Sequence, residues 1–177
     1  MKILKKILIV LAIIIAVLLI AALFIKKDYA IQREIVINRP KQEVYDYVKY
    51  LKNQDNYSKW AKLDPNMKKE YKGTDATVGF VSAWSGNSDV GVGEQEIKAM
   101  APGERIDYEL HFMKPMEAVS PAFMSFEDAS PAQTKVKWGM SGESTYPMNI
   151  MNPFMDGMLG GDLEIGLSNL KSLLEKQ

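Results

Sequence analysis

Apolar residues dominate the start of the chain and then give way to alternating patterns. Nineteen consecutive apolar residues, Ile7–Ile25, are flanked by lysines on both sides. A helix of this length, rising about 1.5 Å per residue, crosses a hydrocarbon core of roughly 30 Å. The pattern predicts one transmembrane helix, with residues 1–27 as an N-terminal membrane anchor and residues 28–177 as a separate domain.

A cleavable secretory signal is the alternative for this segment. Signal sequences have an apolar region of about 7–15 residues, followed by small residues at the cleavage site. Here the run is longer, and residues 24–27 (Phe-Ile-Lys-Lys) stand where small residues would be needed, which favours a retained anchor. Lysines are nearly balanced across the run, so the positive-inside rule gives a slight preference for an extracytoplasmic domain.

Residues 29–38 alternate between apolar and polar positions, which predicts a strand. Its inward face carries Ile31, Arg33, Ile35 and Ile37. Pro40 then suits a first helical turn, and apolar spacings of three and four over residues 44–51 predict a short amphipathic helix. A second short helix is predicted over residues 54–61. The few residues between the apolar run and the first strand should hold the domain close to the bilayer.

The centre of the chain is typical of antiparallel strands joined by turns. Strands are predicted over residues 67–72, 78–84, 91–100, 104–113, 117–127 and 134–143. The strand 104–113 alternates throughout, as in a sheet with one buried face. Pro121 lies inside its predicted strand and indicates an edge strand or a bulge.

Methionine and leucine at helical spacing predict a long helix over about residues 148–175. Pro153 and the glycines at 157, 160 and 161 should kink or interrupt its first half. The predicted order is therefore strand, two short helices, about six antiparallel strands and a long helix. This order defines an α+β fold behind the anchor.

The formal net charge of zero conceals an acidic domain. Five of the 22 basic residues lie within residues 1–27, which leaves 17 basic against 22 acidic residues in the rest of the chain. This balance argues against nucleic-acid binding, which needs clustered Lys and Arg. It also argues against docking by charge onto an anionic membrane surface. The absence of cysteine excludes disulfides and thiolate chemistry.

Candidate catalytic residues are few. His111 is the sole histidine and lies on the polar face of its predicted strand, so neither a two-histidine metal site nor a histidine-based triad is expected. Glu94 and Glu96 share a strand face that alternates as a solvent-exposed face does. Asp156 and Asp162, among the helix glycines, are better placed to lie at the mouth of a pocket. Neither a metal nor a cofactor is predicted.

Several local sequences, in this order, resemble the START-like superfamily (SRPBCC, helix-grip) and within it the polyketide cyclase/dehydrase type. The similar stretches are 35–40 (IVINRP), 44–48 (VYDYV), 56–60 (NYSKW), 91–95 (GVGEQ), 102–106 (PGERI) and 134–138 (TKVKW). The resemblance covers roughly residues 29–175. It implies a helix-grip fold, in which a curved antiparallel sheet of about six or seven strands wraps around the C-terminal helix. It also implies an apolar cavity between them that takes a hydrophobic molecule.

The residues themselves allow two interpretations of that interior. Aromatic residues and methionines either fill the core or line a ligand pocket, where methionine adapts to irregular apolar partners. The candidate cavity residues are Trp60, Phe80, Trp84, Tyr108, Phe112, Trp138, Met140, Met151 and Met155. The preferred hypothesis is a membrane-tethered domain that binds a hydrophobic small molecule or lipid. A cofactor-free cyclase, dehydratase or hydrolase and an envelope protein-interaction module are the alternatives.

Overall fold

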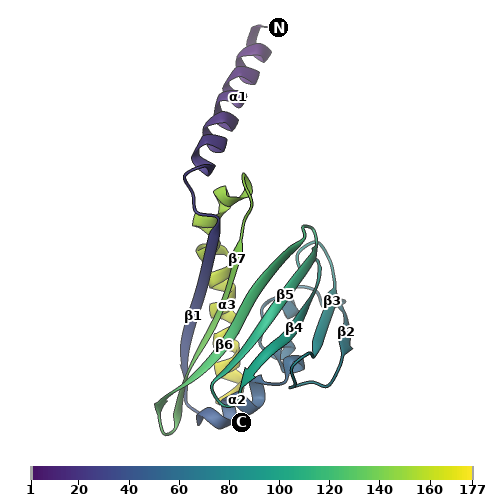
Figure 1. Cartoon of the computed structure of the whole chain (residues 1–177), viewed down its shortest axis with the longest axis vertical. Coiled ribbons are helices and arrows are strands. Elements are labelled where there is room, and N and C mark those ends of the chain that lie inside the picture. Colours follow the sequence, from purple (N-terminus) through teal and green to yellow (C-terminus); the bar gives the residue numbers. More distant parts are fainter. Residues whose placement is uncertain (1, 177) are drawn as a thin grey trace.

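The computed structural model describes residues 2–176 (Figure 1). A long N-terminal helix projects from a domain in which a curved antiparallel sheet faces a long C-terminal helix. The helical elements are α1 (Lys2–Ala22), α2 (Lys41–Val48), η1 (Leu51–Asn56), η2 (Trp60–Lys62), η3 (Met148–Met151) and α3 (Asn152–Leu174), where η marks 3₁₀ turns. The strands are β1 (Asp28–Ile37), β2 (Lys68–Lys72), β3 (Val81–Ser85), β4 (Val92–Ala101), β5 (Arg105–Lys114), β6 (Ala118–Ser130) and β7 (Gln133–Glu143).

The seven strands form one antiparallel sheet in the order β1-β7-β6-β5-β4-β3-β2. Alternate residues are buried along each long strand, as the period of two requires. Ile31 and Ile37 of β1 are buried, and so are Ile97 of β4 and Val136 of β7. The predicted α+β helix-grip architecture is confirmed.

Pro121 lies in the interior strand β6, so the prediction of an edge strand was wrong for the strand as a whole. Pro121 pairs with Glu109 of β5, whereas pairing of β6 with β7 starts one residue later, at Ala122. On the β7 side, β6 is therefore locally an edge at this residue. The missing proline N–H removes no ladder hydrogen bond there.

The helix α3 is continuous, so the predicted interruption was wrong. Pro153 occupies the first helical turn, where its missing N–H has no helical partner to lose. Gly157 and Gly161 have open space around them, whereas Gly160 and Gly166 are buried. The glycines thus mark close approach to the sheet and open surface rather than a break in the helix.

The predicted second short helix is instead two 3₁₀ turns, η1 and η2, separated by Tyr57, Ser58 and Lys59. Their start is fixed by the carboxylate of Asp75, which accepts hydrogen bonds from the backbone N–H groups of Leu51 and Lys52 at 2.8 and 3.2 Å. Asn53 adds a hydrogen bond of 2.8 Å from its Nδ2 to the carbonyl oxygen of Tyr47. Side chains of a later loop and of the turn itself thus replace the missing helical hydrogen bonds.

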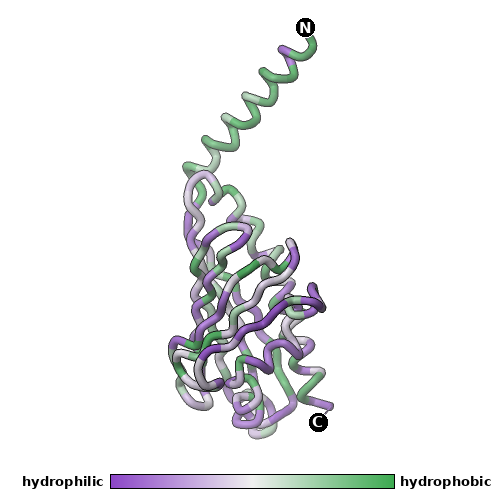
Figure 2. The backbone as a smooth tube through the Cα atoms, turned by 90° about the vertical axis from the view of Figure 1, so that its right-hand side faces the viewer, coloured by the Kyte–Doolittle hydropathy of each residue, from purple (hydrophilic) through white to green (hydrophobic). Residues whose placement is uncertain are grey.

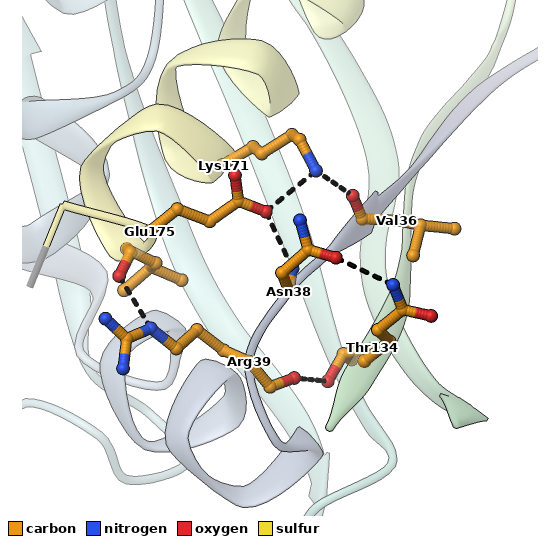
Figure 3. A network of polar contacts seen from close by, with 8 residues as sticks. Val36, Asn38, Arg39, Thr134, Lys171 and Glu175 are labelled. Carbon is orange, nitrogen blue, oxygen red and sulfur yellow. Dashed lines mark hydrogen bonds and ion pairs between the residues drawn. The ribbon is translucent and has the colours of Figure 1, made fainter. Parts of the chain in front are cut away.

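Polar contacts fix the C-terminal end of α3 to the end of β1 (Figure 3). Lys171 Nζ donates to the carbonyl of Val36 at 2.5 Å and contacts Glu175 Oε1 at 2.8 Å. The same carboxylate accepts from the backbone N–H of Asn38 at 2.7 Å, and Arg39 Nε donates to the carbonyl of Leu174 at 2.9 Å. The contact from Arg39 satisfies the carbonyl of Leu174 in the last turn, and together these contacts set the register of α3 on the sheet.

The helix α1 ends at Ala22, three residues before the apolar run does. Asn149 of η3 satisfies carbonyls at this ending, since its Nδ2 donates to those of Ala22 and Ile25 at 2.7 and 2.8 Å. Asn152 Nδ2 likewise donates to the carbonyls of Lys26 and Lys27 at 2.9 and 2.6 Å. The connection from α1 to β1 is thereby held against the start of α3.

Hydropathy separates α1 from the rest of the chain, as Figure 2 shows. The helix is long and apolar enough to cross a membrane, and within its apolar segment of 18 residues none is buried against the domain. Its 21 residues span about 31 Å at 1.5 Å per residue. Large apolar side chains such as Ile7 and Ile20 are more than half exposed along it.

Candidate ligand cavity

A cavity of about 160 Å³ lies inside the domain between the sheet, the η1–η2 segment and α3. All six strands from β2 to β7 contribute to its floor, and Leu159 and Leu163 of α3 form one wall. The opposite cover comes from η1, η2 and the residues around them, including Leu51 and Trp60. The cavity is therefore bounded by elements far apart in the sequence.

Trp138 of β7 is the centre of an aromatic cluster at this cavity. Its ring makes edge-to-face contacts with Tyr57 and Trp60, with centroids 5.8 and 6.2 Å apart. On the helix side, Gly166 leaves room for the indole, because a Cβ there would lie 2.6 Å from Trp138 Cζ3. A glycine in α3 thus positions the aromatic wall of the cavity.

The aromatic part of the floor comes from the hairpin of β3 and β4 and from β5. Gly93 stands opposite both Trp84 and Phe112 in the strand register, and the Trp84 ring folds over it. Trp84 and Phe112 meet edge to face at 6.0 Å between centroids, and Trp84 Nε1 donates to the carbonyl of Val90 at 3.0 Å. The missing side chain of Gly93 gives these two rings their place.

Two ionisable side chains, Asp55 and Lys69, belong to the lining within residues 2–176, and they pair with each other. Lys69 Nζ lies 2.8 Å from Asp55 Oδ1, and Tyr71 Oη donates to Asp55 Oδ2 at 3.3 Å. Burial, then the Asp55 carboxylate, raise the pKa of Tyr71. The positive charge at the cavity is therefore compensated by protein.

Five of the nine predicted cavity residues line this space: Trp60, Trp84, Phe112, Trp138 and Met140. Phe80 is fully buried in the core outside this lining and stacks on Tyr71, with ring centroids 6.0 Å apart. Tyr108 is also buried in the core, where burial raises the pKa of its hydroxyl.

The two remaining predicted residues, Met151 and Met155, lie near the N-terminal end of α3, away from the lining. Met155 packs partly against the core and borders a separate surface hollow beside the start of β1. Of the two, Met155 lies in α3, as the helical spacing predicted, whereas Met151 is the last residue of the 3₁₀ turn η3 just before it. The position of the cavity along that helix depends on the sheet, which the spacing does not report.

Polar lining residues were not among the candidates. They are Gln54, Asp55, Ser58, Lys69, Ser82 and Gln95. Alternation does contain a signal for Gln95: Glu94 and Glu96 point to the polar face, as predicted, so the residue between them points inward. No periodic pattern in the sequence indicates which residues of the η1–η2 segment face the cavity.

The other candidate residues take surface positions. His111 Nε2 lies 2.8 Å from Glu109 Oε1, and this hydrogen bond is the main reason why the pKa of Glu109 is lowered. Asp156 pairs with Arg33, whereas Asp162 pairs with Lys59 beside the cavity residues Ser58 and Trp60. Within residues 2–176, no group of three or more His, Asp or Glu side chains is placed to hold a metal ion.

The curved seven-stranded sheet and the helix that it grips define the chain as a START-like helix-grip protein. Residues 29–175 match the family described as "Polyketide cyclase / dehydrase and lipid transport", and the chain belongs to this family. The family description names both lipid transport and cyclase or dehydrase chemistry. None of the curated proteins matches the chain.

Solved structures share this fold at low sequence identity. Norcoclaurine synthase from Thalictrum flavum, in complex with dopamine and hydroxybenzaldehyde, has a TM-score of 0.67 at 8% identity over 85% of this chain and 88% of its own. Protein MLL2253 from Mesorhizobium loti has a TM-score of 0.61 at 16% identity over 84% and 98%. The di-domain ARO/CYC StfQ of the steffimycin pathway has 0.61 at 9% identity over 84% and 51%. These likenesses show a common fold.

Proposed function

We propose that this chain is a membrane-tethered binding domain for a hydrophobic small molecule or lipid. Residues 1–27 serve as the anchor and residues 28–177 as the binding domain. The observation that carries the proposal is the cavity of about 160 Å³, walled largely by aromatic and aliphatic side chains of the sheet, the η1–η2 cover and α3. Such a pocket with a few polar groups is the usual form of a small-molecule site.

The ionisable groups of the lining favour binding over acid–base catalysis. A general base needs a free group poised near the reacting atoms. Asp55 and Lys69 instead neutralise each other at 2.8 Å. Affinity then comes from removing apolar ligand surface from water, at about 25 cal/mol per Å².

The test is ligand-dependent stabilisation of the full chain purified in detergent. Small molecules that leave with the protein are identified by mass spectrometry, and a panel of hydrophobic compounds is tested for a rise in Tm. Ala122→Leu fills part of the cavity floor, whereas Val119→Leu places the same side chain on an exposed position of the same strand. We expect ligand stabilisation to be lost in the first variant and kept in the second. No bound molecule and no rise in Tm across the panel would refute the proposal.

The anchor and its orientation have a separate test. We expect residues 1–27 to remain in the mature protein and its mass to include them, whereas a cleaved signal would leave a shorter chain. The proposed extracytoplasmic position is tested with Ser168→Cys on the exposed face of α3, because the natural chain has no cysteine. In intact cells a membrane-impermeant maleimide should label this cysteine. Labelling that requires cell lysis would place the domain on the cytoplasmic side.

A further inference from the structure

Two polar side chains stand unpaired in the floor of the cavity. Gln95 of β4 is 8% exposed and Ser82 of β3 is 7% exposed, and both line the cavity. They are directly opposite each other in the strand register. Within residues 2–176 neither side chain makes a hydrogen bond to protein, so their polar atoms face the cavity space. A ligand that covers this amide and hydroxyl must supply hydrogen-bond partners for them, because removing either group from water without a partner costs free energy.

The register places this polar pair between two apolar rows of the sheet, one at the cavity and one in the filled core beside it. One row holds Trp84, Gly93 and Phe112, and the other, on the far side of the pair, holds Phe80 and Ile97. Residues two apart on a strand are separated by about 6.7 Å, close to the length of one substituted ring. A ligand ring packed against Trp84 and Phe112 therefore brings a substituent to Gln95 and Ser82.

The charges of the lining and the volume of the cavity restrict the class of ligand further. The cation of the lining, Lys69, is paired with Asp55, so no fixed charge is left for an ionised ligand. The cavity measures about 160 Å³, and an apolar protein cavity of about 150 Å³ takes one benzene molecule. A neutral molecule with one aromatic ring fits both this volume and the lack of an unpaired charge in the lining.

We propose that the cavity takes a neutral ligand moiety about the size of one aromatic ring, which carries a carbonyl or hydroxyl group bound by Gln95 and Ser82. This inference rests on the proposed binding function and names the chemical class that the site selects. The glutamine amide both donates and accepts, and the serine hydroxyl does the same, so the pair serves a carbonyl or a hydroxyl.

The experiment compares three ring compounds by calorimetry on the full chain in one detergent: acetophenone, ethylbenzene and benzoate. Gln95→Leu removes the amide with little change in volume, Ser82→Ala removes the hydroxyl, and Gln32→Leu is the control on an exposed position of β1. Loss of one hydrogen bond should weaken acetophenone binding by about tenfold in Gln95→Leu. Ethylbenzene binding should not change, and Gln32→Leu should match the natural chain. Comparing variants in the same detergent cancels the partitioning of the probes into micelles.

Two results would overturn the assignment: equal acetophenone affinity in Gln95→Leu and the natural chain, or tighter binding of benzoate than of acetophenone. Circular dichroism of each variant establishes that it is folded, and Ser82→Ala supplies a second, smaller truncation of the same site. Monoolein, a long neutral lipid, separates this inference from the function on which it rests. Binding of monoolein without any ring compound would refute the ligand class alone. Failure of all four compounds to bind would count against the binding function itself.

An independent observation concerns the end of the domain beside α1. Its apolar side chains Tyr146, Met148, Met151 and Phe154, with Phe24 of the connection, are all exposed, Phe154 at 61% and Phe24 at 84%. We call them the juxtamembrane patch. It is continuous with α1, because Tyr146 Oη donates to the carbonyl of Leu19 at 3.4 Å and Asn149 binds the carbonyls of Ala22 and Ile25.

The outward face of α3 becomes polar with distance from this end. Exposed positions at helical spacing are apolar at Met151, Phe154, Met158 and Ile165, and are serine at 168 and 172. Apolar and aromatic side chains next to a spanning helix are typical of the bilayer interface. If α1 spans the membrane as proposed above, we infer that the juxtamembrane patch lies in that interface and contacts lipid.

Single cysteines test this contact, since the natural chain has none. Spin labels at Met151→Cys and Phe154→Cys in phosphatidylcholine vesicles should collide with oxygen more often and with an aqueous nickel chelate severalfold less often than a label at Ser168→Cys. Labels at 151 and 154 as accessible to the chelate as the label at 168 would refute the patch. A label at Ile14→Cys checks the anchor separately, because an aqueous signal there would refute the spanning helix itself.

Discussion

The two halves of the sheet are covered in different ways. Over β1 and β7, the long helix α3 packs closely, and its buried glycines at 160 and 166 let the backbone approach Arg33 and Trp138. Over β2 to β5, the cover is the η1–η2 segment, and a cavity remains beneath it. A long helix presents a regular surface that a sheet can match, whereas short 3₁₀ turns do not.

Polar contacts follow the same division. The closely packed half is fixed at both ends of α3, by Asn149 and Asn152 at the start and by the contacts of Lys171 and Glu175 at the end. Between them Arg33 makes a bidentate pair with Asp156, at 2.8 and 3.0 Å. The cover of the other half depends on Asp75 and Asn53. We therefore expect the closely packed half to determine stability and the covered half to determine ligand access.

The largest effect should come from removing a core side chain of α3. Leu170 is fully buried and Leu159, in the cavity wall, only partly. Leu170→Ala should lower the free energy of unfolding by about 2–5 kcal/mol, because it opens a new cavity in a packed region. Leu159→Ala should cost clearly less, since it enlarges an existing space. Chemical denaturation in detergent measures both, and equal losses would contradict the comparison.

Adding methyl groups should give the second-largest effect and the same contrast between the closely packed half and the covered half. Gly166→Ala places a methyl 2.6 Å from the Trp138 ring, and overpacking of this kind costs about 1–3 kcal/mol. Ala122→Val adds two methyl groups at the cavity floor, where space is present, and should be nearly neutral in stability. Thermal unfolding without ligand tests the pair. A larger loss at Ala122 than at Gly166 would reverse our assignment of the two halves.

Paired asparagine truncations should loosen one region at a time. Asn149→Ala removes the buried amide that holds the end of α1, and Asn53→Ala removes the amide that holds the η1–η2 cover. Each should cost about 1 kcal/mol. Hydrogen exchange should rise in residues 22–27 for the first variant and in residues 51–62 for the second. Identical exchange changes in both variants would show that the two regions open together.

The smallest effect should be the pH dependence of the Arg33–Asp156 pair. Arg33 lowers the pKa of Asp156 below the usual value of an aspartate, chiefly by hydrogen bonding. A carboxyl whose pKa is lowered by folding adds stability above its unfolded pKa and loses it as the pH falls through the folded value. Asp156→Asn should therefore be slightly less stable than the natural chain at pH 7, and the difference should shrink below about pH 4. A difference in Tm that does not change with pH would contradict this account.

Local patterns predicted the elements well and the cavity only in part. Alternation assigned Trp84, Phe112 and Trp138 to inward faces of their strands, because side-chain direction in a strand depends on the residue's own position. The same rule also places Gln95 on the inward face of its strand. Tyr108 and Phe80 follow that rule too, yet they lie in the filled core, since alternation reports direction and not the distance to the opposing element.

No sequence pattern of comparable strength predicted the η1–η2 cover. Its turns are held by Asp75, which lies more than twenty residues further along the chain, and by contacts with Trp138. Such partners are set by the tertiary structure. The sequence predicted one short helix over residues 54–61, carrying Tyr57 and Trp60, but Tyr57 instead lies between the two 3₁₀ turns.

The sequence by itself determined the apolar N-terminal helix, the acidic domain behind it, the order of strands and helices, and the family. All of these rest on composition or on periods of two and 3.6 residues, which act locally. Only the tertiary structure decided where α1 ends, where the cavity lies, and that Ser82 and Gln95 meet within it. These features arise between segments distant in the chain, where packing geometry and hydrogen-bond partners, rather than local propensity, set the outcome.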